Sequence, residues 1–237
     1  MGFFSSLGSA ISSGISTVCS GIASVASSIG SAVSHFSTNI APKLMTVIGG
    51  VASKLNTVVS VIQAVAVIWD VLGKDEKIED IGDRAIQAGE SGISMDQFKD
   101  FDTYMAAIRN FDLDESKSAK SELITKQLTG MAVVNTGLAE KLSVDSSDLG
   151  NLWLLPATNE SYFTAERIAS LLEKTSDISD VIKYFENDLT PMDSFTIEKE
   201  ILASEKSLEP TKQDADIYRD LADIQQSLAK VAQQIES

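Results

Sequence analysis

The chain has 237 residues, of which 43% are hydrophobic, and a formal net charge of −15. The acidic excess argues against a nucleic-acid partner, because affinity for nucleic acid comes mostly from Lys and Arg that neutralise phosphates. A single cysteine, Cys19, excludes an internal disulfide, and a single histidine, His35, removes most metal and nucleophile chemistry. We therefore expect no nucleic-acid partner, no cofactor, no metal, no catalytic residues and no enzymatic activity.

Charge is distributed unevenly along the sequence. Residues 1–42 contain no Lys, Arg, Asp or Glu, and up to residue 73 the only charged side chains are Lys43, Lys54 and Asp70. The first 73 residues therefore carry a net +1, which leaves −16 for the remainder. We expect two parts: an apolar region at 1–73 and an acidic domain at 74–237.

Large apolar residues recur through the first forty positions at intervals of three or four. They are Leu7, Ile11, Ile15, Val18, Ile22, Val25, Ile29, Val33, Phe36 and Ile40. The mean interval, about 3.67 residues, is that of an eleven-residue helical repeat and not of a strand. This stripe predicts one long helix from about residue 5 to residue 39.

Small residues fill the positions between the members of the stripe. Serine is frequent there, and the glycines of the region are Gly8, Gly14, Gly21, Gly30, Gly49 and Gly50. Small side chains allow helix backbones to approach closely, which is how helices associate in lipid. We expect these glycines to provide close packing between helices, and the stripe to face lipid or another copy of the chain.

A second apolar run follows Pro42, which predicts a helix break and a turn at residues 39–43. The run extends over 44–72, and one helical face of it carries Val58, Val61, Ile62, Val65, Ile68 and Trp69. Its β-branched residues also permit a buried strand. Residues 1–73 thus predict a helical hairpin, each arm of which is long enough for a bilayer core of about 30 Å.

The acidic part shows successive amphipathic helix patterns. Ser94 begins a capping-box pattern, and a longer helical pattern covers 115–142. Thr164 precedes another helix, Thr190 and Pro191 begin the next, and a long C-terminal helix is expected over 211–236. The sequence therefore predicts an all-α fold with an uncharged N-terminal hairpin and an acidic helical bundle.

Motifs for specific chemistry are weak. The acidic stretch at 112–116 fails the calcium-loop pattern, since Lys117 and Leu123 stand where that loop needs Gly and Glu. Met1 and Gly2 begin a short N-myristoylation pattern that requires a eukaryotic host and is weakened by the bulky Phe3. The favoured interpretation is that Phe3, Phe4 and Leu7 form a hydrophobic tip. Pairs of carboxylates in the acidic part leave an enzyme as a minor alternative.

Two interpretations of the uncharged hairpin remain open. In one, the hairpin is a core element that the acidic bundle covers; in the other, it inserts into a membrane or assembles there. The two are compatible, because a hairpin hidden in one state can be released in another.

The segments GSAISSGIS, SGIASVASSIGSAVS and VIGGVASKLNTVVSVIQAVAVIW resemble the glycine-zipper regions of pore-forming bacterial effectors, including those delivered by type VI secretion systems. The resemblance covers residues 1–73 only. It implies a secreted toxin that makes an ion-permeable lesion in the inner membrane of a target bacterium, and an immunity protein that protects the producer. A second resemblance is to viral minor capsid proteins that perforate membranes, although the acidic C-terminus departs from their basic tails.

These observations lead us to expect a non-enzymatic, membrane-active protein that is soluble before insertion and whose N-terminal hairpin inserts and oligomerises. Its expected partners are a lipid bilayer, further copies of itself, and an immunity protein or chaperone. The alternative is a self-assembling helical component of a virion or secretion apparatus.

Overall fold

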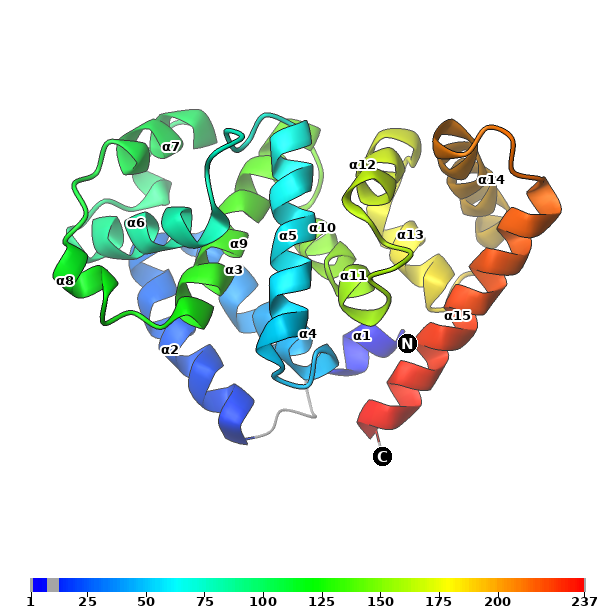
Figure 1. The fold of residues 1–237 in the computed structure, drawn as a ribbon, viewed down its shortest axis with the longest axis horizontal. Helices are drawn as coiled ribbons and strands as arrows, with labels where there is room; N and C mark the ends of the chain where they lie inside the picture. Colours follow the sequence, from blue (N-terminus) through cyan, green and yellow to red (C-terminus); the bar gives the residue numbers. More distant parts are fainter. Residues whose placement is uncertain (1, 8–12, 237) are drawn as a thin grey trace.

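The computed structural model describes residues 2–7 and 13–236, and the described residues form helices and turns without strands. This confirms the all-α fold class. In Figure 1, α5 (Ala52–Ile68) crosses in front of α9 (Leu123–Leu142), which lies in the left-hand half of the view. Nearly every residue of α9 from Gln127 to Ala139 is buried.

The described residues of the uncharged third form five α-helices, where the expected hairpin has two. They are α1 (Phe3–Ser6), α2 (Ser13–Ile29), α3 (Ser31–Asn39), α4 (Ala41–Val47) and α5. The single helix expected over 5–39 is therefore wrong. Gly30 interrupts it with a φ of 154°, a backbone conformation that side-chain-bearing residues rarely adopt.

The turn expected at residues 39–43 is also wrong. Pro42 lies in the first turn of α4, where its missing N–H costs nothing because that group has no partner within the helix. The chain reverses instead at Gly49 and Gly50, whose φ values are 63° and 71°. The turn of the hairpin therefore lies closer to the C-terminus than expected, and α5 is the second arm.

The acidic part contributes the remaining helices. They are α6 (Ile78–Glu90), the 3₁₀ turn η2 (Met95–Gln97), α7 (Phe101–Arg109), α8 (Glu115–Ser118), α9, α10 (Ser146–Leu152), α11 (Leu154–Thr158), α12 (Ala165–Lys174), α13 (Ile178–Phe185), α14 (Pro191–Leu208) and α15 (Asp214–Glu236). The capping box at Ser94, the caps at Thr164 and Thr190, and the long C-terminal helix are confirmed. The helix expected over 115–142 is divided into α8 and α9.

One continuous core unites the two parts of the chain. Buried apolar residues extend from Phe4 to Leu228, across the boundary at residue 73. Helices α2 and α3 pack on α6 and α9, and α5 packs on α9, α11 and α12. In Figure 1, α15 lies along one side of the molecule, and its C-terminal half runs beside α1. The acidic helices therefore cover the apolar ones.

Candidate functional site

The apolar stripe lies in the core of this structure. Its buried members are Leu7, Ile22, Ile29, Val33, Phe36 and Ile40. Ile15 and Val25 are half-buried against the same core, whereas Ile11 and the side chain of Val18 lie outside the described residues. The stripe therefore contacts protein here and not lipid, as in the interpretation that makes the hairpin a core element.

The N-terminal glycines provide little close packing within the chain. A methyl group on Gly21, Gly49 or Gly50 would meet no atom within 4 Å, and one on Gly30 would meet the Met95 Cβ at 3.0 Å. Gly8 lies outside the described residues, and Gly14 falls in α2. Packing of these glycines between copies of the chain stays a prediction.

Glycine-mediated packing occurs instead between α6 and α9. A methyl group on Gly82 would collide with the Lys126 carbonyl oxygen, and one on Gly130 would collide with the Ile78 carbonyl oxygen. An ion pair of 2.8 Å between Lys126 Nζ and Asp83 Oδ2 lies at the same crossing. The signal in the sequence was a glycine in the middle of each helical pattern, where glycine is otherwise unfavourable.

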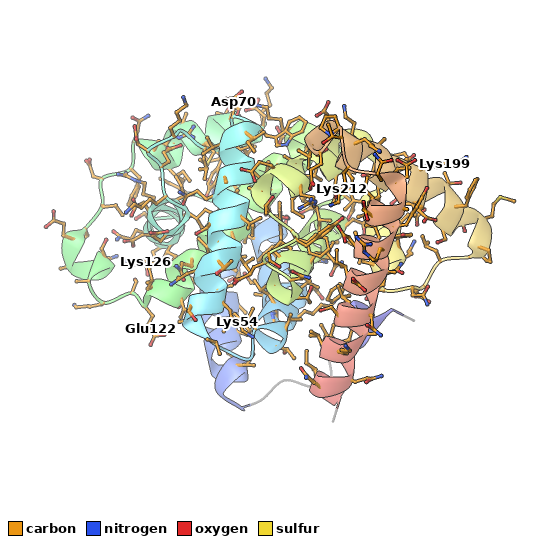
Figure 2. The ribbon with its side chains drawn as sticks, turned by 45° about the vertical axis from the view of Figure 1, so that its right-hand side comes forward. Lys54, Asp70, Glu122, Lys126, Lys199 and Lys212 are labelled. Carbon is orange, nitrogen blue, oxygen red and sulfur yellow. The ribbon has the colours of Figure 1, made fainter. Side chains whose placement is uncertain are left out.

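The second arm is buried along most of its length. Val58, Val61, Ile62 and Val65 are buried, whereas Ile68 is 51% exposed. Trp69 is half-buried at the end of α5, and its indole N–H has no hydrogen-bond partner among the described residues. Figure 2 shows the exposed Lys54 and Asp70 at opposite ends of α5, so the charged groups of this arm flank its apolar length.

Several hydroxyl groups of the uncharged helices donate hydrogen bonds to their own backbones. Ser24, Ser28 and Ser37 each donate to a carbonyl three or four residues earlier, at distances of 2.7–2.8 Å. Thr46 and Ser60 do the same in α4 and α5. The helices therefore satisfy these polar groups without water.

Membrane-spanning helices and metal sites are two features that the proposed chemistry could require. Among the described residues, no helix combines the length and apolarity needed to cross a bilayer. The same residues contain no group of three His, Cys, Asp or Glu side chains placed to hold a metal ion. Cys19 is buried on α2, which raises the pKa of its thiol, and His35 is exposed on α3.

A cluster of partly buried charges surrounds the N-terminal segment. Phe4 N donates a hydrogen bond of 2.5 Å to Glu186 Oε1 at the end of α13. Lys43 of α4 and Asp148 of α10 border the same cavity, which has a volume of about 280 Å³. No sequence pattern predicts this cluster, because its members come from four separate segments.

Comparison with protein-family models, with curated proteins and with solved structures finds no match for this chain.

Proposed function

We propose that the protein is a non-enzymatic, membrane-active protein that stores its N-terminal helices in the core and releases them into a bilayer. Several copies then assemble there into a path for ions. The proposed target is the inner membrane of a bacterium. The proposed partners are lipid, further copies of the chain, and an immunity protein or chaperone that binds the acidic helices.

The observation that carries this proposal is that nearly uncharged helices pack against helices of a strongly acidic part of the chain. Residues 1–73 bear only three charged side chains, yet they supply α1 to α5, which pack against helices from the part of the chain with net charge −16. The acidic helices disfavour contact with anionic lipid while they cover the apolar ones. An ordinary core does not require one terminal segment to be nearly free of charged side chains.

The serines support transfer of these helices into lipid. A polar group in a bilayer is costly unless it is hydrogen-bonded, because the hydrocarbon offers no partner. The hydroxyls of Ser24, Ser28 and Ser37 already bond within their helices. Their presence therefore costs less in lipid than the serine content alone indicates.

In this structure, the separate helices α2 and α3 do not have the length that a bilayer-spanning helix requires. Helices α2 and α3, with Gly30 between them, extend over about 27 residues, or roughly 40 Å as one helix at 1.5 Å per residue. That length exceeds the bilayer core of about 30 Å. The proposal therefore requires that the break at Gly30 straightens on release.

A reversible disulfide next to this break tests the proposal. Ser31 Oγ lies 3.0 Å from Asp96 Oδ1, so cysteines at both positions are placed to join α3 to η2. The matched control joins α12 to α14 through Ser170 and Ser204, whose hydroxyl oxygens are 2.8 Å apart. Both pairs are made with Cys19→Ser and added to dye-loaded vesicles of phosphatidylethanolamine and phosphatidylglycerol.

We expect the oxidised Ser31→Cys/Asp96→Cys protein to release no dye, and reduction to restore release. The control should release dye in both redox states, because its disulfide lies within the acidic helices. Equal leakage from the oxidised and reduced forms of the Ser31/Asp96 pair would contradict release of α3. No leakage by the unmodified chain, together with a stable oligomer in detergent-free buffer, would favour the self-assembling component instead.

A further inference from the structure

The N-terminal segment, residues 2–7, is docked into the body of the protein. Phe4 and Leu7 are each only 2% exposed, and Gly2 is also buried. Figure 1 shows α1 between α4 and the C-terminal half of α15. Release of the uncharged helices therefore begins at a segment that must first leave its own binding site.

The Glu186 carboxylate makes a direct polar contact with this segment. It accepts the hydrogen bond from Phe4 N, and a methyl group on Gly2 would collide with the same carboxylate. Glu186 thus lies directly against the first residues of the chain. Water reaches this carboxylate fully only when residues 2–7 move away.

Charged groups from several elements face Glu186. Lys43 comes from α4, Asp148 from α10 and Lys183 from α13, and Asp188 follows α13. The positive charge of the chain's amino terminus also acts on Glu186. Helix α15 contributes only uncharged side chains, among them Gln225, Gln226 and Gln233, to the neighbouring cavity of about 430 Å³.

Three ionisable groups around the cavity have pKa values shifted against their charged forms, whereas the hydrogen bond with Asp180 raises the pKa of Lys183. Burial raises the pKa of Glu186; the Phe4 N–H and Lys43 oppose this effect without cancelling it, and Asp188 adds to it. Burial, with Asp145 and Asp177, raises the pKa of Asp148. Burial also lowers the pKa of Lys43, against the attraction of Glu186. An ionised Glu186 therefore weakens the docked arrangement, even though it accepts a hydrogen bond there.

We propose that Glu186 is a proton-operated latch, which holds residues 2–7 when its side chain is protonated and loosens them when it ionises. The protonated carboxyl keeps a carbonyl oxygen for the Phe4 N–H and removes the buried negative charge. The latch itself stands on the geometry of the docked segment; its role in starting membrane insertion rests on the proposed function.

The direction of the pH effect follows from linkage. The pKa of Glu186 is raised while residues 2–7 are docked and returns toward its ordinary value, about 4.3, when they leave. The docked state therefore binds the proton more tightly. Docking is strongest below about pH 4.3 and weakens as the pH rises through the raised pKa. Residues 2–7 are therefore docked more firmly at acidic pH than at neutral pH.

Hydrogen exchange of the full chain between pH 5 and pH 8 tests the latch. The exchange rate of the peptide that contains residues 2–7 is divided by the intrinsic rate at each pH. We expect its protection to be lower at pH 8 than at pH 5, because the docked state binds the proton more tightly. Glu186→Gln keeps the acceptor without the charge, so we expect high protection at every pH.

Glu140→Gln is the matched control, because the Glu140 carboxylate accepts the Phe101 N–H at 3.2 Å at the start of α7. It should leave the exchange of residues 2–7 as in the unmodified chain. Protection that does not change with pH in the unmodified chain, or that is lost in Glu186→Gln, would overturn the latch.

Dye release by the same variants separates this inference from the proposed function. Glu186→Gln should slow leakage at pH 7.5, whereas Glu140→Gln should not. If no variant causes leakage, the proposed function fails, and the exchange result still decides whether Glu186 controls docking.

Discussion

At the residue scale, the buried charged groups divide into those that are well paired and those that are not. Glu205 is only 1% exposed, yet its carboxylate accepts from Arg167 Nε at 2.7 Å and from the Tyr162 hydroxyl at 2.8 Å. The Arg167 guanidinium also lies 4.3 Å above the centre of the Tyr162 ring. Glu186 has no such complete set of partners, which makes its site the weaker of the two.

Replacement of two glycines tests where close packing matters. Gly130→Ala should lower the free energy of unfolding by about 1–3 kcal/mol or more, because the added methyl meets the backbone of α6. Gly21→Ala should raise it by about 0.5–1 kcal/mol, because α2 gains helix propensity in open space. Urea denaturation measures both, and the opposite order would contradict the packing described for α6 and α9.

At the element scale, the sequence predicts helices whose ends are specified locally. Thr164 and Thr190 each accept a hydrogen bond from the backbone N–H three residues later, so both caps are visible in the sequence. The start of α3 is different. Asp96, 65 positions away in the chain, accepts from Ser31 N at 2.9 Å, and no local pattern reveals such a partner.

Local sequence patterns also leave open what the apolar stripe contacts. The repeat of about 3.67 residues predicted which apolar side chains of α2 and α3 lie together on one face. It did not identify what they contact, because lipid and a protein core select the same side chains. The buried cluster at Glu186 was beyond prediction, since it depends on how α1, α4, α10 and α13 meet.

The break between α2 and α3 gives a prediction of its own. Gly30→Ala should cost about 1–3 kcal/mol of stability, because its φ of 154° suits only glycine, and the Met95 Cβ lies at 3.0 Å from the added methyl. The same change favours a continuous helix, so vesicle leakage should become faster.

Gly50→Ala is the control for this change. Its φ of 71° also disfavours alanine, but the α4–α5 turn does not form part of the joined helix. It should lower stability without the same gain in leakage. Equal leakage from the two variants would show that general destabilisation, and not straightening at residue 30, controls release.

At the scale of the whole molecule, the uncharged helices pack against a largely buried helix of the acidic part. Helix α9 contacts α2, α3 and α5, so the uncharged helices depend on it for their cover. A chain that ends at Glu122 lacks α9 and every later helix. We expect it to aggregate, whereas a chain that ends at Gln213 lacks only α15 and should remain soluble with reduced stability.

Sedimentation and circular dichroism of the two truncated chains measure these outcomes. A soluble, helical fragment that ends at Glu122 would contradict the dependence on α9.

The order of the helices along the chain also has a consequence in time. Helix α5 ends at Ile68, but two of the helices that cover it, α9 and α12, end only at Leu142 and Lys174. At a synthesis rate of about 5–20 residues per second, the uncharged helices leave the ribosome roughly 5–20 seconds before their cover is complete. During that interval α9 and α12 are not yet available to bury α5. We therefore expect the chaperone or immunity protein proposed above to act at this stage.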